Sequence, residues 1–169
     1  MERGSLSLWI YASIVVGAGL FFAALLISAI FEPSIRVLHT FQALIYVAVI
    51  VLTRKHNSWG YGAGVFIAAL WNYVNIFVTT FVPNGVQELM LLVRTGQTQH
   101  PNQFIAVVAA GGHFLLIFAC LAGFLRTRPG LKQWGQFVAG GVLAIGYFVA
   151  IIVTTGPQYV ELLKRTLHL

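Results

Sequence analysis

Two histidines, His39 and His113, are the residues of this chain whose type and spacing could do chemistry. Each lies fifteen residues before an arginine, Arg54 or Arg128, that closes an apolar run. Two neutral imidazoles that face each other across a helical bundle provide the axial ligands of a haem. The spacing therefore predicts haem b or another tetrapyrrole between His39 and His113, or one chlorophyll-type ring on each histidine.

Three further residues complete this predicted cofactor site. Gly111 and Gly112 are expected to leave room for a flat ring beside His113, and Arg36, one turn before His39, can neutralise a propionate. Two other roles stay open for the histidines: each can hydrogen-bond a neighbouring helix and only hold the bundle together, or line a substrate site. Two histidines without further ligands are too few for a zinc site, so no metal site is predicted.

A second group of candidates follows helical spacing on the third apolar run. Asn72 and Asn75 are costly to bury in lipid and must face protein, a cofactor or water. Trp71 beside them lies in mid-span, where it either lines a pocket or faces lipid. Helical rise predicts a polar substrate pocket in the outer half of the membrane, and the plainer alternative is amide hydrogen bonding between helices. The predicted pocket residues are Gln42, Tyr46, Asn72, Asn75 and Thr79.

The composition places the chain in a lipid bilayer. Of its 169 residues, 59% are apolar and 8% are charged, with a mean hydropathy of +0.86, whereas roughly a quarter of the residues in a soluble domain are charged. Five runs without Lys, Arg, Asp or Glu have roughly the 17 to 25 residues that a spanning helix needs. No alternating strand pattern is present, so an all-α integral membrane protein is predicted. The five predicted spans are residues 9–30, 37–53, 59–82, 104–125 and 134–155.

The apolar runs contain an internal duplication. Residues 59–80 and 134–155 are identical at eight of 22 positions, both beginning Trp-Gly and ending Val-Thr-Thr. The runs before them align His39 with His113. Each unit holds two spans, so the two units point the same way through the membrane. We therefore predict two parallel-repeat helical hairpins that form a pseudo-twofold four-helix bundle.

The duplication divides one membrane domain into a first transmembrane helix (1–33), a first repeat unit (34–96) and a second repeat unit (97–169). The first span has no repeat partner and is predicted to be a retained, peripheral helix, because its apolar stretch is longer than the roughly 7 to 15 residues of a signal core. Pro83 and Pro157 each precede a short amphipathic run, which predicts two interfacial helices. The predicted contact face of the first span is Ser13, Gly17, Ala24 and Ser28.

The net charge of +6 is read as a topology signal, because the basic residues lie between the spans. The side that holds both short turns carries six of them and the other side four, which predicts a cytoplasmic amino terminus and an outside carboxyl terminus. The predicted partners are membrane lipids and a homo-oligomer or a larger membrane complex, with no nucleic acid. The two sets are Arg3, Arg54, Lys55, Arg126, Arg128 and Lys132, against Arg36, Arg94, Lys164 and Arg165.

The scarcity of acids disfavours several mechanisms. The chain has no aspartate, and its four glutamates lie at span ends or in surface segments. Carboxylate-bridged metals, aspartyl catalysis and carboxylate proton relays need acids at membrane depth. The single cysteine, Cys120, excludes an intrachain disulfide, and no Gly-x-Ser-x-Gly motif is present. No enzyme is therefore predicted.

Three functions remain as hypotheses. The first is a non-catalytic subunit or electron carrier of a membrane complex with a tetrapyrrole between His39 and His113. The second is a small-solute transporter or channel that uses the polar pocket around Asn72. The third is a purely structural subunit without a cofactor, in keeping with the small size and the many small-residue faces of the chain.

Overall fold

A computed structural model describes residues 7–155, 160 and 164 of the chain, and this part consists of helices joined by turns, with no strand. Five helices are long and apolar enough to cross a membrane, which confirms the predicted all-α class and number of apolar helices. They are α1 (Leu8–Phe31), α2 (Arg36–Arg54), α3 (Ser58–Tyr73), which a π-turn (Val74–Val78) extends, α5 (Phe104–Arg126) and α6 (Leu131–Thr155). The shorter helices are η1 (Pro33–Ile35), α4 (Phe81–Thr95) and η3 (Pro101–Gln103).

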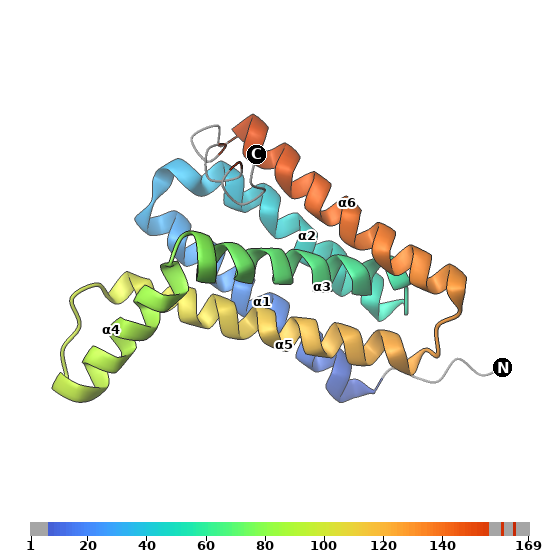
Figure 1. The fold of residues 1–169 in the computed structure, drawn as a ribbon, viewed down its shortest axis with the longest axis horizontal. Coiled ribbons are helices and arrows are strands. Elements are labelled where there is room, and N and C mark those ends of the chain that lie inside the picture. The colour runs from blue at the N-terminus through green and yellow to red at the C-terminus, as the bar shows by residue number, and fades with distance from the viewer. Residues whose placement is uncertain (1–6, 156–159, 161–163, 165–169) are drawn as a thin grey trace.

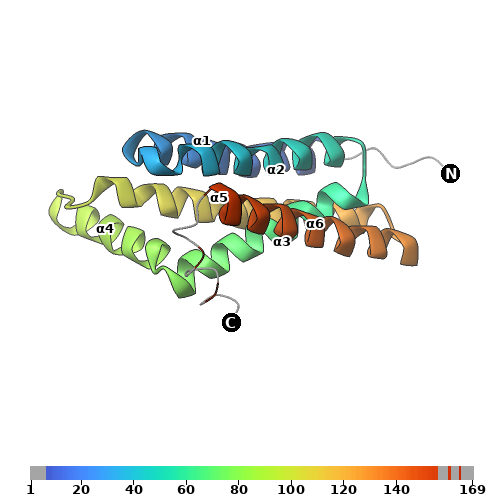
Figure 2. The ribbon, with the colours of Figure 1, turned by 90° about the horizontal axis from the view of Figure 1, so that it is seen from above.

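The spanning helices form two layers. α1 and α2 lie side by side in one layer, and α3, α5 and α6 lie in the other (Figure 2). Within the second layer α3 runs between α5 and α6 (Figure 1). α1 packs on α5, and α2 packs on both α3 and α6, so the two layers meet along three pairs of helices. Any side chain between them is shielded from lipid by helices on both sides.

The first span packs on α5, and Gly17 and Ala24 of its predicted small-residue contact face are buried. A Cβ atom at Gly17 would lie 2.7 Å from the carbonyl oxygen of Gly112, so α1 and α5 touch backbone to backbone. Ile14, Ala18 and Phe21 of α1 are at most 1% exposed. The repeat pattern gave α1 no partner, but close packing in a membrane depends on small residues that let backbones approach, and Gly17 with Gly112 provides such a contact.

The two predicted hairpins are packed differently. α2 and α3 are in contact with each other, whereas α5 and α6 meet only near their turn in the described residues. There the Phe124 ring stacks on Phe137 at a centroid distance of 4.4 Å and meets Trp134 edge-on at 4.8 Å. Further along, α3 takes the place between them, because Gly62 fits against the backbone of Phe137 and lets α3 approach α6 closely.

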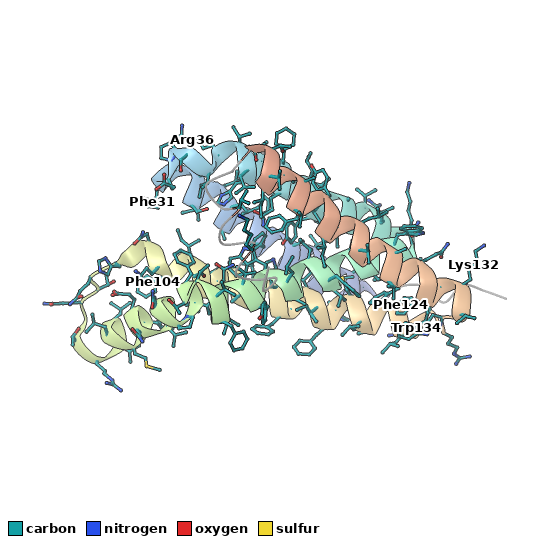
Figure 3. The ribbon with its side chains drawn as sticks, turned by 45° about the horizontal axis from the view of Figure 1, so that its top comes forward. Phe31, Arg36, Phe104, Phe124, Lys132 and Trp134 are labelled. Atoms are coloured by element: carbon teal, nitrogen blue, oxygen red, sulfur yellow. The ribbon has the colours of Figure 1, made fainter. Side chains whose placement is uncertain are left out.

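The ends of the bundle differ in charge. Figure 3 shows Phe31 and Arg36 at one end of the spans, and Lys132 and Trp134 at the opposite end. The turns from α2 to α3 and from α5 to α6 both lie at the Lys132 end (Figure 1). This end therefore gathers five basic residues, which are Arg54, Lys55, Arg126, Arg128 and Lys132.

α4 corresponds to the first predicted surface helix. It begins after Thr80, whose backbone is left-handed with φ of 57°, and it turns away from the axis of α3 (Figure 1). Gly85 packs against the backbone of Gln103, which places α4 against the start of α5. The second predicted surface helix, after Pro157, lies almost entirely outside the described residues.

Glu88 of α4 holds the segment that leads into α5. One oxygen of its carboxylate accepts hydrogen bonds from the Thr98 hydroxyl at 2.8 Å and from the backbone N–H groups of Gln99 and His100 at 2.9 and 3.0 Å. The side chain is 7% exposed. The bonds from the His100 N–H and the Thr98 hydroxyl favour the charged form and lower the pKa of Glu88.

We expect Gly112→Ala to destabilise the protein and Gly111→Ala to leave it unchanged or slightly more stable. A Cβ atom at Gly112 would lie 2.9 Å from the carbonyl oxygen of Gly17, whereas at Gly111 it would meet nothing within 4 Å. Overpacking of this kind costs about 1 to 3 kcal/mol, and an open helical Gly→Ala change gains up to about 1 kcal/mol. Thermal unfolding of the two variants in one detergent measures the difference, and equal melting temperatures would contradict the packing of α1 on α5.

We expect the segment 98–100 to loosen in acid. Because the pKa of Glu88 is lowered in the folded protein, its stabilising contribution is complete above the unfolded pKa of about 4.3 and is lost as the pH falls through the lower folded value. Hydrogen exchange of this segment, corrected for the intrinsic rate at each pH, measures the loosening. In Glu88→Gln the segment should exchange fast already at neutral pH, and a variant with the pH response of the parent protein would refute the role of the carboxylate.

Candidate functional site

The candidate site is a cluster of four buried polar side chains between the two helix layers, here called the polar cluster. It consists of Gln42 and Tyr46 of α2, Asn72 of α3 and His113 of α5. Their exposed fractions are 3%, 1%, 4% and 0%. Buried polar groups in a membrane-spanning protein are expensive and mark functional positions more often than apolar ones do.

His113 is fixed in place by one hydrogen bond, to Tyr46, and by the rings of Tyr46, Phe21 and Trp71. Its Nε2 lies 2.8 Å from the hydroxyl of Tyr46. The ring of Phe21 stacks on the imidazole at a centroid distance of 3.9 Å, and Trp71 meets it edge-on at 4.9 Å. The contacts come from α1, α2 and α3, so all three helices position this one side chain.

Gln42, Asn72 and His113 lie at one depth. Nearer the basic end, a Cβ atom at Gly64 of α3 would lie 2.8 Å from Cys120 Sγ of α5 and 3.1 Å from a Val49 methyl of α2. α3 runs opposite to α2 and α5 (Figure 1). Two helical turns, about 10 to 12 Å of rise, separate this contact from the polar residues on the same helix faces. Toward the opposite end of the bundle, they lead from Gly64 to Asn72, from Val49 to Gln42 and from Cys120 to His113.

The three side chains at this depth hold unpartnered polar atoms. Four buried side-chain atoms in the described part of the chain have no hydrogen-bond partner. All four belong to these residues: Gln42 Nε2, Asn72 Nδ2 and Oδ1, and His113 Nδ1. A buried polar atom without a partner costs about 1 to 3 kcal/mol, and proteins pair nearly all of them. Their concentration at one depth on three helices makes these residues the candidate site.

Two residues of the predicted pocket do not join the cluster. Asn75 Nδ2 donates to the Trp71 carbonyl at 3.0 Å, and the Thr79 hydroxyl donates to Asn75 Oδ1 at 3.2 Å. Both lie at the π-turn Val74–Val78, where their side chains bond to each other and to the backbone of their own helix. The prediction assumed regular α-helical spacing through these residues. The π-turn breaks that spacing, so Asn75 and Thr79 face a different direction from Asn72.

His39 and Arg36 tie α2 to α1. His39 Nδ1 lies 3.1 Å from the Leu25 carbonyl, which only accepts, so this nitrogen carries the hydrogen. It also lies 3.0 Å from the hydroxyl of Ser28. The Arg36 Nε donates to the Ala29 carbonyl at 2.8 Å. These bonds satisfy polar groups at the junction of the first two spans.

The two histidines have different neighbours. His113 bonds to Tyr46 through Nε2, the nitrogen that ligates iron in most haem proteins, and its ring contacts do not include His39. Gly112 does not leave room for a ring, because α1 fills the space beside it, and Gly111 points to the outside of the bundle. A tetrapyrrole between the histidines stays a prediction of the sequence alone. The described residues contain no group of three potential metal ligands among His, Cys, Asp and Glu.

Comparisons with protein-family models, curated proteins and solved structures found no match. The function is therefore argued from the chemistry of the site.

An apolar groove of about 670 Å³ lies on α3 and α6 near the basic end. Its lining offers almost no hydrogen-bonding groups, so nothing in it would select a polar ligand. The lining residues are Trp59, Trp134, Gly135, Val138, Ala139, Val142 and Leu143.

Sequence reasoning found the four polar residues but missed how they are supported. Phe21 was not a candidate, because the repeat contains no information on where α1 packs. The mid-span position of Trp71 was the available signal, and its ring faces the protein interior, where it contacts His113. The bond between Tyr46 and His113 joins residues 67 positions apart and has no sequence signature.

We expect Tyr46→Phe to destabilise the protein more than Tyr147→Phe does. Removing the Tyr46 hydroxyl leaves Nε2 of the buried His113 without a partner, at a cost of about 1 to 3 kcal/mol. The Tyr147 hydroxyl donates to the Phe41 carbonyl at 3.2 Å on an exposed surface, where the loss is about 0.5 to 1.5 kcal/mol. Unfolding of both variants in the same detergent gives the comparison, and a smaller effect at Tyr46 would argue against the bond.

Proposed function

We propose that this protein is a non-catalytic membrane carrier or channel for a small polar solute, which binds at the polar cluster. The observation that carries the proposal is the gathering of four unpartnered buried atoms on Gln42, Asn72 and His113 at one depth. A solute that leaves water loses its hydrogen bonds, and a protein that conducts it must replace them inside the bilayer. Amide and imidazole groups can do this without a fixed charge.

The absence of acids from the cluster favours passive movement. Proton-coupled and cation-coupled transport use carboxylates at membrane depth. Glu32 and Glu88 are the glutamates among the described residues, and both lie outside the spans. We therefore propose movement of the solute down its own gradient.

We also propose that the bundle arose from two parallel repeats whose pseudo-twofold axis passes between α3 and α6. Two contacts between these helices support this. Gly62 packs on Phe137, and Gly141 packs on the ring of Phe66. In each pair the residue of α6 lies 75 positions after the residue of α3 (137 − 62 and 141 − 66), which is the offset of the duplicated sequence. Parallel helices that meet at equivalent residues are expected beside such an axis.

Asn72→Leu tests the proposed function by two independent measurements. We expect this variant to be more stable than the parent protein by up to about 1 to 3 kcal/mol in solute-free detergent, because it removes two unpartnered buried atoms. In proteoliposomes it should lose at least tenfold in solute flux. The flux panel consists of chloride, acetamide, glycerol and guanidinium, each compared with protein-free vesicles.

Asn75→Leu is the matched control. Its amide has partners within its own helix, so we expect this variant to lose stability and keep the flux of the parent protein. If the parent protein conducts none of the four solutes, or if Asn72→Leu conducts as well as the parent, the proposed function is wrong.

A further inference from the structure

We infer that the polar cluster selects a small hydrogen-bond acceptor, either a monovalent anion or a neutral carbonyl compound. This inference rests on the proposed function and names the class of solute. The balance of donors and acceptors among the unpartnered atoms of Gln42, Asn72 and His113 determines which solute fits.

The bond between Tyr46 and His113 fixes the donor on the imidazole. A neutral imidazole has one N–H group. If Nε2 carried the hydrogen and donated to Tyr46, the phenolic hydrogen would lose its acceptor and Nδ1 would be an unpartnered acceptor. If the Tyr46 hydroxyl donates to Nε2, only the Nδ1–H of His113 lacks a partner. The second arrangement satisfies one more buried group, so Nδ1 of His113 is a donor.

Donors therefore outnumber acceptors in the cluster. Three of the four unpartnered atoms donate: Gln42 Nε2, Asn72 Nδ2 and His113 Nδ1. Asn72 Oδ1 is the single acceptor among them. A ligand that offers lone pairs can satisfy all three donors, whereas a cation or another donor-rich solute would compete for one oxygen and leave the nitrogens unpaired.

Electrostatics point the same way. No carboxylate belongs to the cluster, so a cation would enter a low-dielectric site without a counter-charge. Five basic residues lie around the turns at one end of the bundle and raise the local concentration of anions there.

The aromatic neighbours restrict the ligand to small molecules. Phe21 stacks on the imidazole of His113, and the Trp71 ring packs edge-on against it. Because Phe21 covers a face of the ring, the ligand must approach Nδ1 in the plane of the ring. Chloride and acetamide are suitable probes of the two acceptor sources, since both are small and one is an anion while the other is a neutral carbonyl compound.

The test measures flux into proteoliposomes of the whole protein for chloride, acetamide, glycerol and guanidinium, with valinomycin and potassium to balance charge for the ions. We expect the flux of chloride, of acetamide or of both to exceed the flux into protein-free vesicles at least tenfold. Whether chloride or acetamide passes shows whether the site takes an anion or a neutral carbonyl compound. Guanidinium offers only donors, and glycerol is larger than either acceptor, so neither of them should exceed the vesicles. If either of them passes while both acceptors do not, the inference is overturned and the proposed function stands. If none passes, both fail.

Gln42→Glu and Asn75→Asp make the same chemical change inside and outside the cluster. Gln42→Glu replaces a donor by an acceptor, so it should reduce acceptor flux at least tenfold, whereas Asn75→Asp should keep it within twofold. If Gln42→Glu does not fold, Gln42→Leu removes the donor without adding charge, and the same loss is expected. Unchanged flux in the folded Gln42 variant would overturn the inference.

Discussion

A polar atom buried in a membrane-spanning bundle must find its partner inside the protein, because lipid offers none. This constraint explains most of the polar side chains in the structure. The Thr53 hydroxyl donates to the Val49 carbonyl, His39 bonds to the Leu25 carbonyl, and Asn75 bonds to the backbone of its own helix. The unpartnered atoms of the polar cluster depart from this rule, and all of them lie on three neighbouring side chains. Departures of this kind are expected at functional sites.

Glycines determine how close the helices around the cluster can lie. Gly17 and Gly112 join α1 to α5, and Gly140 joins α6 to the backbone of Trp59 in α3. The contact of α1 with α5 brings Phe21 onto the face of His113, so the packing of one helix pair orients the central imidazole. Packing and site chemistry are therefore linked through α1, the helix that the duplication does not account for.

The sequence predicted the apolar helices, because these depend on hydropathy. It did not predict which helices and side chains contact each other, because these contacts depend on the packing of the whole bundle. The predicted span 104–125 agrees with α5 (Phe104–Arg126). The prediction succeeded because an apolar run without charged residues is visible directly in the sequence. The small residues of the first span predicted a contact face, of which Gly17 and Ala24 are buried, but the repeat could not show which helix this face meets. Asn72 was placed correctly in the interior by the cost of a buried amide, but Asn75 was misassigned because a π-turn changes the facing of residues after Tyr73. The equal spacing of His39 and His113 concealed that one faces α1 and the other faces Tyr46.

The central claim is that Gln42, Asn72 and His113 hold a bound solute and do not bond to one another. The most direct measurement is a high-resolution experimental structure in a lipid nanodisc, determined with a conducted solute present. We predict density within hydrogen-bond distance of His113 Nδ1 and of both amide side chains. Direct hydrogen bonds among these three side chains, with no density between them, would contradict the account.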